Sequence, residues 1–189
     1  NTPYEQSRTT RAVFAGLDGQ WGAVSVQLNL RDDKVGDLHK GTGYLGVGYA
    51  ITDHIKATAS TSTAFNAPPL GYLFAPGYGN PLLKPELANS DELGLQYAQG
   101  PHLLRATYFD TRVQDQLTYD TTTFAFANLD RMKNRGLELS YRGSGAVSQW
   151  RASLTLQDPV NEKTGEVLQR RAKQLASVGV FQTSGAWQW

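Results

Sequence analysis

The chain has 189 residues, no cysteine and a formal net charge of +1. The balanced charge argues against a nucleic-acid partner, and the lack of cysteine excludes a disulfide scaffold and thiolate metal sites. No stretch approaches 18 consecutive apolar residues, which excludes a transmembrane helix but not a membrane barrel, since every second residue of a barrel strand faces the lumen. Residues 1–6 show no basic start followed by an apolar stretch, so no signal peptide is visible. The many glycines, tyrosines and hydroxyl residues favour an all-β protein.

Apolar residues recur along the chain with a period of two. The first clear segment is 23–31, whose aliphatic face is formed by Val24, Val26, Leu28 and Leu30. The same alternation returns at 44–51, 92–97, 136–142 and 150–157. A helix of about 3.6 residues per turn would scatter these side chains around its axis. The pattern predicts strands at 8–18, 22–31, 42–51, 55–65, 90–98, 102–118, 125–142, 148–157 and 172–182, with a tenth beginning at Trp187.

The lengths of these strands fit a membrane. Most contain about ten residues, and at about 3.3 Å per residue and a tilt of roughly 45° each spans about 23 Å, close to the apolar band of an outer-membrane barrel. All eight prolines fall outside the predicted strands. Because proline cannot donate a ladder hydrogen bond, this distribution indicates strands that are paired on both sides.

Two classes of connection alternate along the chain. Short turns are predicted at Asp18–Gly19, Thr52–Asp53, Gln99–Gly100, Gly143–Ala146 and Ser184–Gly185. Longer polar loops are predicted at 32–41, 66–89, 119–124 and 158–171. The loop 66–89 is expected to lack regular strands and to start with one short helical turn at 68–72, because proline suits the first helical position. Outer-membrane barrels have short periplasmic turns and long outside loops, so we expect the long loops outside.

The alternation also predicts which face each side chain occupies. Four aromatic residues beside short turns share the parity of the aliphatic faces and form a candidate periplasmic girdle: Tyr49, Tyr97, Tyr141 and Trp150. Leu95, Leu139 and Leu154 are expected to point toward lipid, and Gln96, Glu138 and Thr155 into the lumen. Other charged residues of the lumenal set are expected to hold polar partners across the wall: Glu92, Arg105, Arg142 and Arg151.

The predicted fold class is therefore all-β, an antiparallel transmembrane β-barrel segment of about nine or ten strands. The alternative is a soluble β-sandwich with tyrosines near its turns, which requires both the loop alternation and the aromatic placement to be coincidental. An open sheet with one apolar face exposes its unpaired edges and a large apolar surface. We therefore expect residues 1–189 to be a segment of a larger barrel.

Three stretches resemble the C-terminal half of TonB-dependent outer-membrane receptors. The first is Ser62–Leu70, with its Phe-x-Ala-Pro segment; the second is Asn80–Glu86, followed by Glu92–Leu95; the third is Asn128–Asp130 with Asn134–Glu138. They occur in the family's order and spacing across about residues 55–142. The resemblance implies a barrel of 22 strands that holds an N-terminal plug and imports scarce nutrients with energy from an inner-membrane complex. Residues 1–189 are expected to be a partial barrel domain without the plug, so TonB-type coupling is expected through a missing N-terminal region.

A fourth stretch, Gln169–Gln174, is similar to the start of a late strand in the cobalamin receptors of this family. The resemblance implies that the first arginine of Arg-Arg-Ala-Lys-Gln, Arg170, contacts cobalamin, with Arg171 the weaker candidate because its parity points it the other way. A guanidinium offers five fixed donors to a phosphate and to amide carbonyls. The alternative is that both arginines face the acidic lipid headgroups at the membrane boundary. In the loop 66–89, the rings of Tyr72, Phe74 and Tyr78 are candidate contacts for a large ligand, or else pack the loop onto its neighbours.

The remaining motifs give weaker evidence about function. Gly41–Gly46 matches the dinucleotide fingerprint, but it lacks the preceding strand and following helix that the fingerprint needs, so its glycines are expected to thin the lumenal wall. Asp32, Asp33 and Asp37 share a loop with lysines that oppose calcium binding. Neither a metal site nor a cofactor is expected, and no catalytic arrangement stands out. The expected function is cobalamin import by the intact parent in the bacterial outer membrane, with an iron-chelate receptor as the alternative and a small barrel enzyme or a porin as the alternative of another class.

Overall fold

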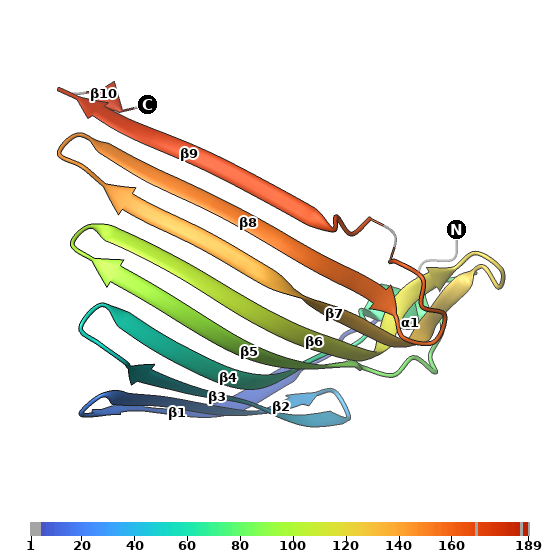
Figure 1. Ribbon diagram of the computed structural model, residues 1–189. Helices are drawn as coiled ribbons and strands as arrows, with labels where there is room; N and C mark the ends of the chain where they lie inside the picture. Colours follow the sequence, from blue (N-terminus) through green and yellow to red (C-terminus); the bar gives the residue numbers. More distant parts are fainter. Residues whose placement is uncertain (1–4, 169, 186, 189) are drawn as a thin grey trace.

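The computed structural model describes residues 5–168, 170–185 and 187–188. In these ranges the chain forms one antiparallel sheet of ten strands, and each strand pairs with its neighbours in the chain (Figure 1). The strands are β1 (Thr10–Trp21), β2 (Val24–Val35), β3 (Leu38–Ala50), β4 (Ile55–Asn66), β5 (Glu86–Gln99), β6 (His102–Asp120), β7 (Ala125–Ser144), β8 (Ser148–Asn161), β9 (Gln174–Ser184) and β10 (Trp187–Gln188). The predicted number and order of strands are confirmed.

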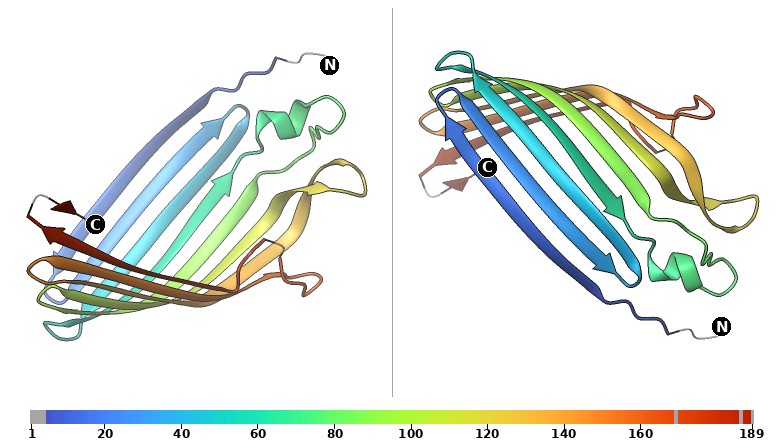
Figure 2. Two further views of the ribbon diagram at one scale, coloured as in Figure 1. Left: turned by 90° about the horizontal axis from the view of Figure 1, so that it is seen from above. Right: turned by 90° about the horizontal axis from the view of Figure 1, so that it is seen from below.

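The sheet curves into an open trough with a convex and a concave face (Figure 2). The register places apolar side chains from consecutive strands directly opposite one another, for example Leu95 with Ala106, Ala106 with Leu139 and Leu139 with Leu154. Glu138 and Thr155, which have the opposite parity, line a hollow of the concave face. The predicted facing of the wall is therefore confirmed, with the concave face as the lumenal face.

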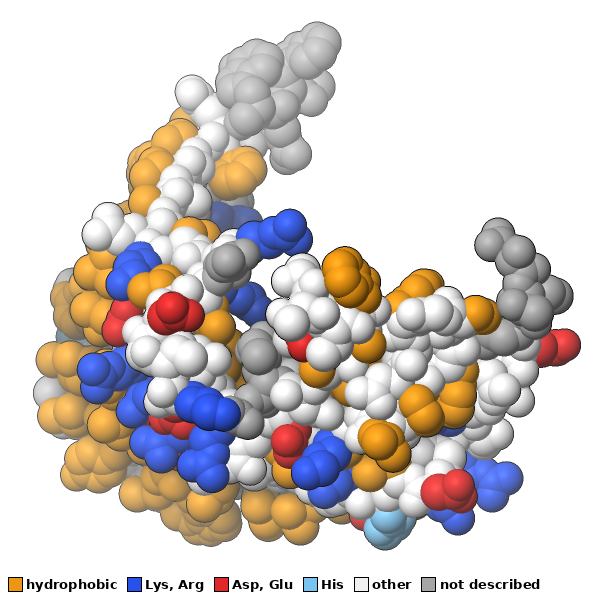
Figure 3. Space-filling view, turned by 90° about the vertical axis from the view of Figure 1, so that its right-hand side faces the viewer, with side chains coloured by type: hydrophobic (Ala, Val, Ile, Leu, Met, Phe, Trp, Pro, Cys, Tyr) orange, Lys and Arg blue, Asp and Glu red, His pale blue; other side chains and the backbone are white. Residues whose placement is uncertain are grey.

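The wall has no core of the kind that a soluble sandwich needs. Among the described residues, the buried hydrophobic side chains are Val35, Ala75 and Leu83, none of which belongs to the regular apolar rows of the wall. In those rows Leu93 is 63% exposed and Leu95 is 52% exposed. Figure 3, seen from the loop end, shows hydrophobic side chains over the convex side of the wall. An apolar surface of this extent is suited to lipid.

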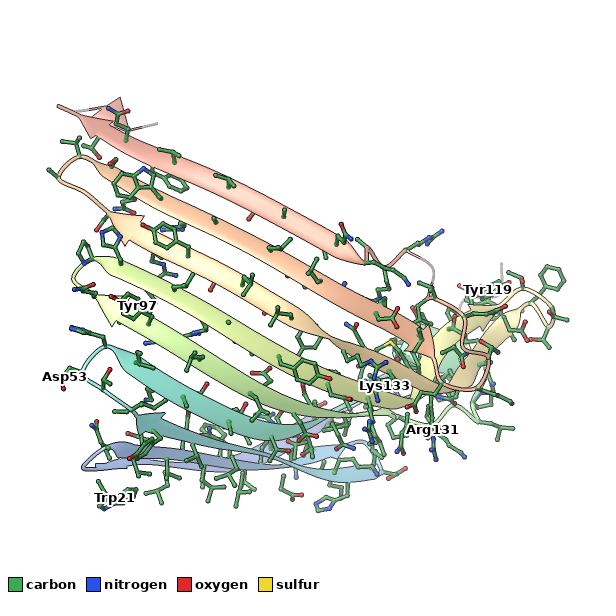
Figure 4. The ribbon with its side chains drawn as sticks, in the orientation of Figure 1. Trp21, Asp53, Tyr97, Tyr119, Arg131 and Lys133 are labelled. Carbon is green, nitrogen blue, oxygen red and sulfur yellow. The ribbon has the colours of Figure 1, made fainter. Side chains whose placement is uncertain are left out.

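One end of the trough, here named the turn end, carries short connections. The predicted turns near Thr52 and Gly100 are confirmed; Thr52 Oγ1 accepts hydrogen bonds from the backbone N–H groups of His54 (3.2 Å) and Ile55 (3.0 Å). The predicted turn at Asp18–Gly19 is wrong, because β1 continues to Trp21 and the chain turns at Gly22, whose φ of 56° suits glycine. Trp21 thereby joins Tyr97 near the turn end of the wall (Figure 4).

The opposite end, here named the loop end, departs further from the sequence prediction. The predicted loop 32–41 is mostly strand, since β2 and β3 pair as far as Val35 and Leu38 and leave a two-residue turn at 36–37. Likewise β6 and β7 pair up to Asp120 and Ala125, so 119–124 contains only a short turn. The strict alternation of short and long connections is therefore wrong. Beyond the lipid, outward positions need not be apolar, so the hydrophobic pattern stops while backbone pairing continues.

Pro159 is a second correction, because it lies within β8 and is fully buried. The backbone N–H groups of Gln157 and Asn161, two residues to either side, donate to Lys173 and Glu166 on the side away from β7. The nitrogen of Pro159 faces that same side, where the ladder between β8 and β9 has already ended at Leu156. Proline is tolerated there because no ladder hydrogen bond is lost.

Residues 67–85 form the longest connection, and they contain the helix α1 (Leu70–Phe74). The predicted helical turn after Pro69 is thus confirmed, whereas residues 86–89 belong to β5 and not to the loop. Of the helices in the described ranges, none has the length and apolar character needed to cross a membrane.

Candidate ligand-facing surface at the loop end

The loop 67–85 folds back on itself at the loop end of the trough. The backbone N–H groups of Tyr72 and Ala75 donate to Pro69 (2.9 Å) and Gly71 (3.1 Å), which closes the helix α1. The chain then reverses, so that the N–H of Asn80 donates to the carbonyl of Tyr72 at 2.7 Å. At the reversal, a Cβ on Gly79 would lie 2.6 Å from the backbone nitrogen of Ala75, so a larger residue does not fit without a backbone shift.

Asn128, on β7, fastens this loop to the hairpin formed by β6 and β7. Its side-chain amide donates to the carbonyl oxygens of Lys84 (2.9 Å) and Asp115 (2.6 Å), and its Oδ1 accepts from the backbone N–H of Lys84 (2.9 Å). Asp115 has a φ of 55°, so the strand backbone departs from extended geometry where Asn128 holds it. We name this arrangement the Asn128 clamp.

Two further side chains support the clamp. Asn80 donates from Nδ2 to the carbonyl of Phe126 at 2.9 Å. Glu86 accepts from the backbone N–H of Leu117 and from Asn66 Nδ2, both at 2.7 Å. These four residues all come from the stretches that carry the family resemblance: Asn66, Asn80, Glu86 and Asn128. Those stretches therefore encode the attachment of the loop to the wall.

An aromatic cluster lies over the clamp, with Phe126 at its centre. Tyr72 stacks on Phe126 at 3.6 Å between ring centroids, while Tyr78 and Tyr119 meet it edge-on at 6.0 and 5.4 Å. Tyr78 and Tyr119 remain 48% and 44% exposed. Tyr72 and Tyr78 thus pack the loop onto the hairpin, as one of the two sequence interpretations held, and still present ring surface to solvent.

Phe74 stands apart from this cluster. It is 41% exposed, and among the described rings it forms no aromatic contact. Phe126 and Tyr119 were missed at the level of sequence, because nothing in a period-two pattern distinguishes a ring that packs against a distant loop. The nearest signal was the position of Phe126 two residues before Asn128 of the third resembling stretch.

The structure places Arg170 and Arg171 in the connection between β8 and β9, and both are exposed. Arg170 lies in a turn with a φ of 59°, and Gln169 lies outside the described residues. The ninth strand begins at Gln174 instead of residue 172, and Gln157 anchors the approach by donating to the carbonyl of Ala172 at 2.7 Å. Neither arginine touches the aromatic cluster by any contact that the structure records.

The lumenal face below this surface is polar. Arg105 donates to Gln96 at 2.9 Å, and the guanidinium of Arg151 lies 5.1 Å from the ring centroid of Phe181. Glu92 and Arg105 line adjoining hollows of the concave face. These contacts cross between neighbouring strands, which agrees with the structural role expected for the lumenal charges.

The glycines of the fingerprint-like stretch divide between the faces. Gly46 points into the lumenal hollow, where an added Cβ would lie 2.9 Å from the ring of Tyr44. Two of the three carboxylates that were weighed as a calcium site are paired: Asp33 accepts two hydrogen bonds from Arg31 (2.7 and 2.8 Å), and Asp32 lies 2.9 Å from His39. No group of three or more metal-ligating side chains occurs in the described part of the chain.

The family model described as "TonB dependent receptor-like, beta-barrel" matches residues 1–189. The chain belongs to this family. The family consists of bacterial outer-membrane transporters and receptors, which are not enzymes. The open trough is accordingly a segment of such a barrel, and the recognition made from three short stretches is confirmed.

Among curated relatives, the chain is 30% identical over 173 residues to "Vitamin B12 transporter BtuB" of Vibrio cholerae, covering 90% of this chain and 28% of that protein. The chain thus spans under a third of the relatives that it matches. Among solved structures it resembles "Copper transporter OprC" (TM-score 0.79, 18% identity, 96% of this chain and 32% of that one). It also resembles the ferric enterobactin receptor PfeA of Pseudomonas aeruginosa (TM-score 0.78, 18% identity, 95% and 31%). At these identities the structural likeness establishes the fold alone.

Proposed function

We propose that the intact parent of this chain is a bacterial outer-membrane transporter that binds cobalamin and imports it with energy coupled from the inner membrane. The observation that carries the choice of substrate is the identity of 30% to a vitamin B12 transporter over nearly the whole chain. The Arg-Arg-Ala-Lys-Gln stretch at residues 170–174 supports the same substrate. The plug and the segment that contacts a TonB-type protein belong, in this proposal, to parts of the parent outside residues 1–189.

The loop end faces the outside in this proposal and receives the ligand. Arg170 contacts the cobalamin from the connection between β8 and β9, where it is exposed and free to reach the mouth of the barrel. Its guanidinium donates to the phosphate and amide carbonyls that cobalamin presents, and such charge-assisted hydrogen bonds contribute about 1.5–3 kcal/mol. Tyr78 and Phe74 offer exposed ring surface on the opposite loop. Arg171 contributes less to cobalamin binding than Arg170 does.

The test is cobalamin binding by the intact receptor with Arg170→Ala, which we expect to weaken affinity by at least about tenfold. Arg170→Lys should also weaken binding, because lysine keeps the charge but loses the planar fork. Arg11→Ala, an exposed arginine on β1, is a matched control that should bind normally. Unchanged affinity for Arg170→Ala in a correctly inserted barrel would remove this site assignment.

Binding and uptake measurements on the intact receptor distinguish cobalamin import from the alternative functions. Binding of a ferric siderophore in place of cobalamin would favour the iron-chelate alternative. Hydrolysis without uptake, or passive diffusion of small solutes, would favour a barrel enzyme or a porin. We expect cobalamin uptake that stops when the inner-membrane proton gradient is collapsed.

A further inference from the structure

The ladder between β3 and β4 ends before either strand does. The two strands pair with each other only as far as Tyr44 and Ser62. Beyond that point β3 continues through residues 38–43 paired with β2 alone, and β4 continues through residues 63–66 paired with β5 alone. The wall is therefore divided at the loop end. We name the division between residues 38–43 and 63–66 the seam.

Few contacts join the two edges of the seam. The backbone N–H of Gly43 donates to a side chain, Thr63 Oγ1, at 2.9 Å, in place of a backbone carbonyl. The two outward positions of β3 nearest the ladder are Gly41 and Gly43, so no side chain of β3 reaches across the convex face there. A hollow of about 550 Å³, lined in part by Gly41, Gly43 and Thr63, lies at this place.

On the β4 side of the seam, several segments are joined into one unit. Glu86 accepts from Asn66 at the end of β4 and from the backbone N–H of Leu117 on β6, both at 2.7 Å. The Asn128 clamp fastens the loop 67–85 to the same hairpin of β6 and β7. The end of β4, the loop and the hairpin are thereby held together, independently of β3.

One side chain from the β3 side crosses the seam. Arg8, which precedes β1, donates from Nη1 to the carbonyl of Pro68 at 2.7 Å. Its segment is attached to the tip of the β2–β3 hairpin, because the N–H of Gly36 donates to the carbonyl of Thr9 at 2.9 Å. Both views of Figure 2 place this tip beside α1. Among the hydrogen bonds between described residues of the segment 5–85, only those of Arg8 and Thr63 cross the seam.

We propose that the seam is a gate in the mouth of the barrel and that Arg8 is its latch. When the bond between Arg8 and Pro68 breaks, the tip of the β2–β3 hairpin moves away from α1 and the mouth widens. When the bond re-forms, the loop that carries Tyr72, Phe74 and Tyr78 is held in place. Arg8 is a positioning residue, since it acts through this loop. The gate deepens the proposed function and rests on it for the identity of the ligand.

The physical basis of the gate is the small number of bonds that opening must break. Parting two strands along a ladder breaks backbone hydrogen bonds at every second residue and leaves their donors and acceptors unpaired. Along the seam the backbone groups have no strand partner to lose. Regions with few contacts open locally at a much lower free energy than paired strands. The pair of Tyr44 and Ser62, where the ladder begins, is the fixed point about which the two edges part.

The first experiment measures the gate without any ligand. In the intact receptor, spin labels on Asp37→Cys, at the tip of the β2–β3 hairpin, and Leu82→Cys, in the loop, report the distance across the seam by electron paramagnetic resonance. Arg8→Gln should shift this distance distribution to longer values. Arg11→Gln removes the same charge from an exposed position on β1 and is the matched control, with the distribution of the parent.

The second experiment measures ligand entry and release. Arg8→Gln should raise the association and dissociation rates of cobalamin together by about tenfold, as expected for the loss of one charge-assisted hydrogen bond, and leave the affinity nearly unchanged. A short, reducible thiol cross-linker between Gly43→Cys and Thr63→Cys should lower both rates until it is reduced. The same cross-linker between Leu45→Cys and Thr61→Cys, which are already paired in the ladder, should change neither rate.

An unchanged distance distribution in Arg8→Gln would overturn the gate, and so would cobalamin rates that the cross-linker at the seam does not alter. A change in affinity with no parallel change in the two rates would give Arg8 a structural role only and would also overturn it. The cross-linked receptor keeps Arg8, so this test stands even if Arg8→Gln does not fold. Failure of the parent to bind cobalamin would overturn the proposed function instead, and the distances measured without ligand would then decide the gate.

Discussion

Asn128 shows how one side chain fixes the position of a long loop. Its amide group uses both donor and acceptor atoms on the backbone of two other segments, Lys84 and Asp115. An amide is suited to this task because it can donate and accept at once. A carboxylate in the same place could not donate to the two carbonyl groups.

Substituting Asn128→Ala removes three hydrogen bonds, and we expect the clamp to open with a stability loss of about 1–3 kcal/mol. The loop 67–85 should then exchange its amide hydrogens faster and be cleaved sooner by added protease. Asn89→Ala, on the exposed outward face of β5, is the control and should behave as the parent. Equal protection of the loop in both variants would show that the aromatic cluster alone holds it.

Gly136 illustrates a different constraint on a single residue. A Cβ at this position would collide with the carbonyl oxygen of Leu156 and lie 2.8 Å from the ring of Phe109. The ring of Phe109, on β6, therefore occupies the space that a side chain at position 136 would fill, on the lumenal face of the wall.

For Gly136→Val we expect a destabilisation of about 1–3 kcal/mol from overpacking, measured by urea unfolding of the barrel in detergent or vesicles. Gly41→Val is the matched control, because the nearest atom to its added Cβ is the carbonyl oxygen of Arg31 at 4.0 Å. If both variants unfolded at the same urea concentration, the contact between Phe109 and Gly136 would have no energetic weight.

At the scale of the strand, the alternation of side chains decides which substitutions the wall tolerates. Leu139 sits between Ala106 and Leu154 on the convex face, whereas its neighbour Ser140 sits between Arg105 and Ser153, which have the lumenal parity. Leu139→Arg in the intact barrel should cost roughly 2–4 kcal/mol if the residue lies near the bilayer midplane.

Ser140→Arg introduces the same side chain one residue away and should cost much less, because it enters a polar space. The comparison is made by the unfolding free energy of the two variants in lipid vesicles. A larger penalty for Ser140→Arg would mean that the faces are assigned the wrong way round.

The strands also show where sequence reasoning succeeds and where it stops. Inside the lipid, each outward position must be apolar, so Leu93, Leu95 and their neighbours record the pairing and the facing in the sequence. Above the lipid that requirement ends, and residues 32–41 read as a polar loop although β2 and β3 continue through them. The expectation that Pro159 lies outside the strands failed for a related reason. A strand tolerates proline where the ladder with its neighbour has already ended, and no local sequence pattern shows where that happens.

The candidate site was foreseen only in its outline. Tyr72, Tyr78 and Arg170 were correctly placed in the connections of the loop end. The partners of the two tyrosines could not be derived, because Phe126 lies far along the chain and meets them through the fold.

At the scale of the whole molecule, the two ends of the trough should face different compartments. Leu82 is 85% exposed in the loop 67–85, and Asp53 lies in a turn at the other end (Figure 4). Since the chain contains no cysteine, Leu82→Cys and Asp53→Cys each introduce one thiol. In intact cells carrying the parent receptor, a membrane-impermeant maleimide should label Leu82→Cys and leave Asp53→Cys unlabelled. Labelling of only Asp53→Cys would invert the proposed orientation.

The strand order has a consequence for how such a wall is assembled. Because β1 to β10 pair only with their neighbours in the chain, most closures between strands are short in sequence and entropically inexpensive. The wall can grow in chain order, with each completed hairpin offering its outermost strand as the template for the next. Until the wall closes, both the growing edge and the opposite edge of the sheet carry unpaired backbone groups, and both must be shielded from pairing with other chains.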